Sequence, residues 1–318
     1  RADGTAPPEP LLTGNRQVTG FSLSRTGLIA FTATDPVNPN EVFVCNADGS
    51  SERQLTDLNR AWKQEVALSR PERFQYERAG YTLDCWVMKP YGFDHGGPAT
   101  QYGHTFFDEF QVYAGAGYAV IFTNPRGSQG YGEEFCRAVI RDWGGCDYED
   151  VMAGLECALR HCDFIDPERL GVMGGSYGGF MAEMLAMRAP ERVACAAALR
   201  PVADWRNYYA SSPVYTTERL GFPDENPEAY RRSSPISYAD QLRRPLLILH
   251  GMLDDNVHFQ DSVQLVQKLI ELGKTSYFEV MFYPKENHSF TRPESWADEY
   301  ERILAFFEKH LEGRKDGR

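Results

Sequence analysis

Three side chains that could carry out acyl transfer together are spread over the second half of the chain. Ser176 lies in a G-x-S-x-G sequence (174–178), the carboxylates Asp254 and Asp255 follow, and His288 comes last. A serine hydroxyl is a weak nucleophile until an imidazole takes its proton, and that imidazole needs a carboxylate to orient it. Serine, acid and histidine follow one another in this order when the serine of a G-x-S-x-G sequence is the nucleophile. The pattern therefore predicts acyl transfer through a covalent intermediate on Ser176.

The G-x-S-x-G sequence has the flanks that this chemistry needs. The apolar run 170–174 precedes Ser176 and good helix formers (177–188) follow it, so the serine is expected on a sharp strand-to-helix turn. The backbone at such a turn is strained, and glycines let neighbouring chain pass close to it. The N–H of Tyr177 would then lie at a helix N-terminus and could bind an oxyanion. The alternative is a glycine-rich turn whose serine has no chemical role.

The acid and the base each follow an apolar run. The run 245–249 leads into His250 and then into Asp254 and Asp255, and a second run leads into His288. One loop could then hold a carboxylate against one imidazole nitrogen while the other nitrogen faces the serine. Adjacent side chains diverge, so only one of the two carboxylates can face His288, and the residue types alone leave the choice open. His250 ends a strand and is expected to be a structural group of the core or strand end.

Apolar runs alternate with helical patterns from residue 62 onward, which predicts an α/β fold with a mostly parallel sheet covered on both faces. The expected strands are 81–88, 118–123, 170–174, 193–199, 245–250 and 277–283, and the expected helices are 147–161, 177–188, 260–272 and 296–311. Chemistry in such sheets gathers in the loops at the carboxyl ends of the strands. The segment 211–240, rich in Pro, Ser and Tyr, is expected to pass over that site.

The first 61 residues have a different pattern of short strands and turns. Runs 28–32 and 41–45 are typical of strands, Asn38-Pro39-Asn40 is expected to break them, and Asp48-Gly49 is typical of a hairpin turn. So short a segment cannot form a β-domain with its own core. We therefore expect residues 1–61 to be one sheet that needs neighbours, and residues 62–318 to be a catalytic domain.

Composition excludes several classes of protein. Of 318 residues, 33 are Lys or Arg and 45 are Asp or Glu, a net charge of −12, which argues against a nucleic-acid partner. No apolar run approaches a membrane span, and no apolar signal core follows the first residues. The seven cysteines include no C-x-x-C pair, so neither a disulfide framework nor a metal site is expected. We expect no cofactor, no membrane partner and a reducing, cytoplasmic compartment, and the sequence leaves a homo-oligomer open.

Three motifs together resemble the prolyl oligopeptidase family of serine peptidases. They are Gly-Gly-Ser-Tyr-Gly-Gly, then His-Gly-Met-Leu-Asp-Asp-Asn-Val-His-Phe, then Glu-Asn-His-Ser-Phe, and the similarity spans about 62–311. The resemblance implies an α/β-hydrolase fold preceded by a β-propeller, of which residues 1–61 look like the last part. It also implies Ser176 as nucleophile, Asp254 as the orienting acid and His288 as base.

The resemblance further implies a substrate pocket. Asn256 matches a position that contacts a substrate carbonyl, and Tyr177 belongs to the same matched set. The segment around Trp205 is similar to the pocket that holds a proline ring in dipeptidyl peptidase IV; the matched positions are Val202, Trp205, Tyr208, Tyr215 and Val257. Flat aromatic walls suit a compact apolar ring, but these aromatic residues could also merely pack the segment onto the core.

The segment before His95 departs from the family pattern. In the family a buried apolar strand precedes His-Gly-Gly-Pro, and a backbone N–H there, here that of Gly97, supplies the second oxyanion donor. No apolar run of strand length precedes His95 in this chain. A missing inner strand would leave backbone groups unpaired, so we expect that residues have been lost from this part of the sequence.

The expected function is therefore that of a serine peptidase acting on short peptides. The resemblance implies release of N-terminal dipeptides or acylated residues with a proline or small apolar residue at P1. An esterase or other acyl hydrolase with the same triad is the main alternative, and a binding protein on a hydrolase fold is the third. The choice among dipeptidyl, acylaminoacyl and endo-oligopeptidase activity depends on groups that grip the substrate N-terminus, which in the family come from the propeller and which this sequence does not show.

Overall fold

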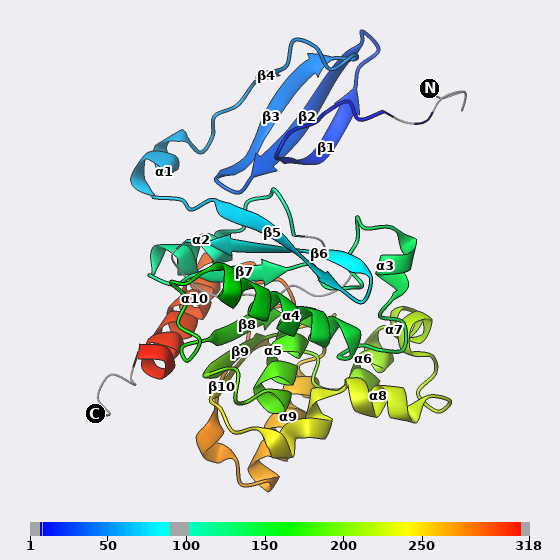
Figure 1. Cartoon of the computed structure of the whole chain (residues 1–318), viewed down its shortest axis with the longest axis vertical. Coiled ribbons are helices and arrows are strands. Elements are labelled where there is room, and N and C mark those ends of the chain that lie inside the picture. The colour runs from blue at the N-terminus through cyan, green and yellow to red at the C-terminus, as the bar shows by residue number, and fades with distance from the viewer. Residues whose placement is uncertain (1–6, 8, 90–101, 313–318) are drawn as a thin grey trace.

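The N-terminal strands form one antiparallel sheet at one end of the long axis of the molecule (Figure 1). The computed structural model describes residues 7, 9–89 and 102–312. The sheet contains, in order, β1 (Gln17–Leu23), β2 (Leu28–Asp35), β3 (Asn38–Asn46) and β4 (Arg53–Gln54). We call this sheet the blade. Its small core centres on Ile29, Phe31, Ala33 and Cys45.

The blade differs from the expectations in two details. The strand β1 was not predicted, because nearly all of its residues are exposed and show no alternation. Asn38-Pro39-Asn40 does not break the pattern: the turn lies at Pro36 and Val37, where the Asp35 carboxylate accepts the Val37 N–H. Pro39 is tolerated within β3 because β4 pairs only with Phe43 and Val44, so its missing N–H costs no bond to β4.

The strands after residue 70 form two sheets. A three-stranded antiparallel sheet contains β5 (Pro71–Arg78), β6 (Tyr81–Met88) and β7 (Val120–Thr123). A four-stranded parallel sheet contains, in spatial order, β11 (Phe278–Tyr283), β10 (Leu246–Gly251), β9 (Cys195–Leu199) and β8 (Gly171–Gly175). All six predicted strands of this part are present, and β5 is an addition that its mostly polar sequence concealed.

The two sheets are not joined by a ladder between β7 and β8 among the residues described (9–89 and 102–312). A small cavity of about 150 Å³ lies between their first residues, lined by Ile121 on one side and by Gly171 on the other. The position at which the sequence lacks an expected strand, before His95, lies outside the described residues.

Helices cover both faces of the parallel sheet. The helices α4 (Cys146–His161), α5 (Tyr177–Arg188) and α9 (Gln260–Glu271) pack on one core cluster, and α2 (Asp108–Gly115) and α10 (Pro293–Phe307) pack on the other. Successive side chains of a strand point to opposite faces of the sheet: Leu246 and Ile248 belong to the first cluster, and Leu247 and Leu249 to the second. The predicted helices are confirmed with shifted ends.

The remaining segments are short helices. They are α1 (Arg60–Glu65), α3 (Glu133–Arg137), α6 (Trp205–Ser211), α7 (Pro213–Leu220), α8 (Pro227–Ser233), two 3-10 turns (Pro235–Gln241 and Thr275–Tyr277) and a last π-turn (Glu308–Glu312). The segment 211–240 is thus mostly helical. No helix in the described part is long and apolar enough to cross a bilayer.

A few polar contacts attach the blade to the helical layers. Gln111 of α2, itself buried, donates to the carbonyls of Pro36 and Ser69. The N–H of Phe106 donates to the Thr34 hydroxyl, and Trp62 packs edge-on against the Phe106 ring. These contacts fix the blade next to the β5–β6 hairpin (Figure 1).

Candidate active site

Ser176 lies on a sharp turn between β8 and α5. Its backbone has φ 59° and ψ −113°, a left-handed conformation that a side-chain-bearing residue adopts only under strain. The turn is tight enough that a Cβ on Gly174 would lie 2.6 Å from the Gly178 carbonyl carbon. The Ser176 N–H donates to the Leu199 carbonyl, which ties the turn to β9. The hydroxyl is thereby held at the carboxyl end of the parallel sheet.

The acid and base loops leave the sheet side by side. The strands β10 and β11 are parallel neighbours, with Gly251 opposite Tyr283 at their ends. The loop after β11 then passes so close to β10 that a Cβ on Gly251 would lie 2.4 Å from the Glu286 carbonyl oxygen. Glycine is needed here for space, and the close approach brings Asp254 and His288 within reach of each other.

The structure brings the three predicted side chains into one hydrogen-bonded chain. The Ser176 Oγ lies 3.0 Å from His288 Nε2, and His288 Nδ1 lies 2.7 Å from Asp254 Oδ2. The geometry also settles which carboxylate faces the imidazole, because the side chain of Asp255 is exposed and its N–H instead donates to Asn287. This is the arrangement in which a histidine can take the serine proton while a carboxylate fixes its orientation.

Asp254 is kept ionised by its partners. Burial alone would raise the pKa of its carboxyl, but hydrogen bonds and charge from His250 and His288 outweigh burial and hold the pKa well below its usual range. The other carboxylate oxygen, Oδ1, accepts the N–H groups of Asn256 and Val257. Four donors on one buried carboxylate make it a fixed negative charge behind His288.

Tyr177, the predicted oxyanion donor, is the first residue of α5, so its N–H has no acceptor within the helix. Its side chain is anchored, because the phenol donates to Asp147 at 2.5 Å. Asp147 is buried at the start of α4, and burial raises its pKa to about 6 although the bond from Tyr177 opposes this. The second predicted donor, Gly97, lies outside the described residues.

Aromatic rings gather beside the nucleophile, as the pocket prediction requires. Trp205, Tyr208 and Tyr215 pack edge to face, with ring centroids 5.5 Å apart for the first pair and 6.0 Å for the second. The ring of Tyr177 is 5.8 Å from Trp205, and Trp143 packs against Trp205 at 4.2 Å. These rings form an aromatic wall in which Trp143 and Trp205 are fully buried and Tyr208 and Tyr215 are partly exposed. Their role in holding a substrate remains a proposal.

The other predicted pocket residues have two different environments. Val202 and Val257 are almost fully buried, with 2% and 1% of their surface exposed, so they support the aromatic wall from beneath. Asn256 is exposed, and its Oδ1 accepts the hydroxyl of Tyr208 at 2.9 Å. That bond directs the amide nitrogen of Asn256 away from the Tyr208 hydroxyl.

Three residues near the site were not among the predicted site residues. Trp143 and Asp147 come from the loop and helix that precede the nucleophile, and no motif marks them; a lone tryptophan between turn residues was the only signal for Trp143. His250 was expected to be structural, and it is buried, but its Nε2 lies 3.1 Å from Asp254 Oδ2.

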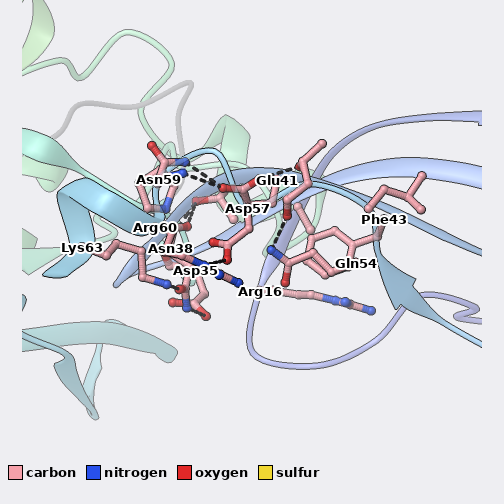
Figure 2. A pocket seen from close by; sticks show the side chains of 15 residues that line it. Arg16, Asp35, Asn38, Glu41, Phe43, Gln54, Asp57, Asn59, Arg60 and Lys63 are labelled. Carbon is pink, nitrogen blue, oxygen red and sulfur yellow. Dashed lines mark hydrogen bonds and ion pairs between the residues drawn. The ribbon is translucent and has the colours of Figure 1, made fainter.

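A separate polar pocket of about 700 Å³ lies between the blade and α1 (Figure 2). Its charged groups have partners within the pocket: Glu41 accepts from Thr56 and Asn59, Lys63 donates to Asn38, and Arg60 pairs with Asp57. Because these groups are already satisfied within the pocket, the contacts give no sign of a ligand. Among the described residues there is also no cluster of three or more side chains suited to a metal ion.

Comparison with known proteins agrees with the fold. Residues 104–314 match the prolyl oligopeptidase family, and the chain belongs to this family of serine peptidases. It is 36% identical to an uncharacterised peptidase, YuxL, of Bacillus subtilis over 95% of this chain and 48% of that protein. It is 32% identical to human dipeptidyl peptidase 8 over 77% of this chain and 29% of that protein.

The solved structures show the same architecture. Acylaminoacyl peptidase of Pyrococcus horikoshii superposes with a TM-score of 0.88 at 28% identity, covering 97% of this chain and 52% of that one. An acylaminoacyl peptidase in complex with Z-Gly-Gly-Phe-chloromethyl ketone gives a TM-score of 0.89. The predicted α/β-hydrolase fold preceded by part of a propeller is thus confirmed. The chain spans about half the length of these relatives or less.

Proposed function

We propose that this chain is the catalytic part of a serine peptidase that cleaves short peptides through an acyl-enzyme. The observation that carries the proposal is the hydrogen-bonded chain from Ser176 through His288 to Asp254. In the same proposal residues 62–318 form the catalytic domain, and residues 1–61 are the end of a propeller.

The reaction runs in two steps. His288 Nε2 takes the Ser176 proton as the oxygen attacks the substrate carbonyl carbon, and the Tyr177 N–H stabilises the negative oxygen that forms. Collapse of this intermediate breaks the amide bond, and His288 gives the proton to the leaving amine. Water, deprotonated by His288, then attacks the acyl-enzyme and releases the acid together with free Ser176.

The aromatic wall supports a preference for a compact apolar side chain before the scissile bond. Tyr208 and Tyr215 offer partly exposed flat faces to a proline or a small apolar residue at P1, and Asn256 could donate to a substrate carbonyl. Trp205 is fully buried and packs against Tyr208, so it supports this surface. We propose that the products are N-terminal dipeptides or acylated residues. The relatives include both a dipeptidyl peptidase and an acylaminoacyl peptidase, so the two remain alternatives to be compared.

Replacement of Ser176 tests the proposal. S176A is expected to lower turnover of a peptide anilide by about 10⁶-fold, since removing the nucleophile of a triad has that effect elsewhere. Comparing Xaa-Pro anilides, N-acetylated amino-acid anilides and short p-nitrophenyl esters on the unaltered chain ranks the substrate classes. Turnover of esters alone would favour the alternative of an esterase, and unchanged hydrolysis in S176A would reject Ser176 as the nucleophile.

A further inference from the structure

The carboxylate of Asp254 lies between two imidazoles. Its Oδ2 is 2.7 Å from His288 Nδ1 on one side and 3.1 Å from His250 Nε2 on the other. His250 is fully buried at the end of β10, whereas His288 is partly accessible and faces the nucleophile. The two histidines thus contact the same carboxylate oxygen, and of the two only His288 is accessible to a substrate.

The partners of His250 determine which of its nitrogens carries the proton. The Nε2 atom faces two acceptors, the Asp254 carboxylate and the Val257 carbonyl at 2.9 Å, so it must be the donor. The Nδ1 atom lies 2.7 Å from the hydroxyl of Ser262 on α9, and a hydroxyl can donate to it. An imidazole with a proton on Nε2 satisfies both acceptors, and the Ser262 hydroxyl can pair with Nδ1.

We propose that His250 is a positioning residue for catalysis, which holds Asp254 in place and takes up part of its negative charge. This inference rests on the proposed function, because it assigns His250 a role in the same triad. Through one N–H group His250 links the acid to the Val257 carbonyl, and through Ser262 it links the acid to α9. His250 therefore fixes the acid loop to the sheet and to a helix. Because its N–H also binds Oδ2, the attraction between Asp254 and His288 is weaker than it would be without His250.

Two substitutions of similar size separate this role from simple filling of the core. In H250Q the side-chain amide nitrogen can occupy the place of Nε2 and still donate to Asp254. In H250N the shorter side chain reaches only the place of Nδ1, beside Ser262, and leaves Asp254 without this donor. We expect H250Q to keep kcat within a few-fold of the unaltered enzyme and H250N to lose about 10- to 100-fold, the loss expected for a hydrogen bond to a charged group. KM should change little in either variant.

The pH profile gives a readout that a merely structural role would not move. In H250N the Asp254 charge acts on His288 alone, which favours the protonated imidazole, so the low-pH limb of kcat/KM should move to higher pH by several tenths of a unit. H250Q should leave that limb in place. Equal loss of kcat in both variants, or an unmoved or downward-shifted limb in H250N, would overturn the proposal.

A measurement on the unaltered protein keeps the proposal testable if H250N does not fold. Nitrogen NMR of histidine-labelled protein should show the His250 proton on Nε2, and a proton on Nδ1 instead would contradict the proposed contact. Failure of the proposed function is seen separately: the unaltered enzyme would then turn over no acyl substrate, and a fluorophosphonate probe would not label Ser176. If the probe labels the unaltered enzyme but labels H250Q and H250N equally slowly, the positioning role of His250 is rejected while the proposed function stands.

Discussion

At the residue scale, the choice of the acid shows where sequence reasoning stops. Asp254 and Asp255 are chemically equivalent in the sequence, and only the resemblance to a family favoured the first. In the fold the loop turns so that Asp254 is buried beside His288 while Asp255 lies on the surface. The direction of a side chain in a tight loop depends on backbone contacts made by residues far away, here by the loop of His288.

The adjacent carboxylates offer a matched pair of variants. D254N keeps the shape of the acid but removes its charge, and it is expected to lower kcat by about 10⁴-fold, as loss of a triad acid does elsewhere. D255N removes an equal charge one residue away, at an exposed position, and should change kcat by less than about threefold. Both rates are measured on one anilide substrate near neutral pH. Comparable losses in the two variants would show that Asp254 does not act alone.

The motif residues of the site could be predicted because their chemistry constrains their spacing. Ser176, Asp254 and His288 must each follow a strand, and that placement is visible in the apolar runs. The residues that hold these side chains in place could not be predicted in the same way. Asp147 reaches Tyr177 from a helix 30 residues earlier in the chain, and no local pattern marks a buried carboxylate that supports a phenol.

At the element scale, the parallel pairing of β10 and β11 positions the acid and the base together. This adjacency follows from two apolar runs joined by a helix, so it was available from the sequence. The closeness of the two loops was not, because it depends on Gly251 lying against the backbone at Glu286. Glycine in a sequence does not reveal whether it serves a turn, a bend or a close approach.

A substitution at Gly251 tests whether this close approach positions His288. The Cβ in G251A would lie 2.4 Å from the Glu286 carbonyl oxygen, so the loop must move. We expect kcat to fall by about 10- to 100-fold, since a displacement of about 1 Å in a catalytic group can have that effect. Stability, measured by urea unfolding, should fall by about 1–3 kcal/mol.

The control for G251A is G115A. Gly115 ends α2, and a Cβ there would meet no atom within 4 Å. This variant should match the unaltered chain in kcat and be equally or slightly more stable, because alanine restricts the unfolded chain. An active G251A of normal stability would mean that the loop of His288 is not held by this contact.

At the scale of the whole molecule, the fold class was predictable but the way in which its sheets meet was not. The alternation of apolar runs with helical patterns predicted a parallel sheet with helices on both faces, and the structure has this arrangement. The hairpin of β5 with β6 was hidden, because β5 is largely exposed and polar. The attachment of the blade through Gln111 was hidden as well, because it joins residues 75 positions apart through one amide group.

Four buried carboxyl groups make the stability of the whole chain depend on pH. Burial raises the pKa of Asp147 to about 6, of Asp261 to about 7 and of Glu299 to about 8, and it raises the pKa of Glu183 well above its usual value. Each folded value lies above the unfolded one, so the native state binds more protons between about pH 4 and pH 8. The stability that these groups contribute is therefore greatest at low pH, and it decreases as the pH rises from about 4 to about 8. Asp254 acts in the opposite direction, because its lowered pKa contributes stability that is lost only as pH falls below about 4.

The replacement of Glu299 by glutamine tests this dependence. Glu299 lies buried on α10, and Arg200, 3.8 Å away, offsets only part of the effect of burial on its pKa. E299Q keeps the shape of a neutral carboxyl at every pH, so the difference in unfolding free energy between pH 5 and pH 8 should shrink by at least about 1 kcal/mol, roughly the equivalent of one pKa unit. E301Q, at an exposed position of the same helix, should leave that difference unchanged. Urea unfolding of the three proteins at both pH values measures it, and an equal difference in E299Q and the unaltered chain would show that Glu299 is already ionised in the native state at pH 5.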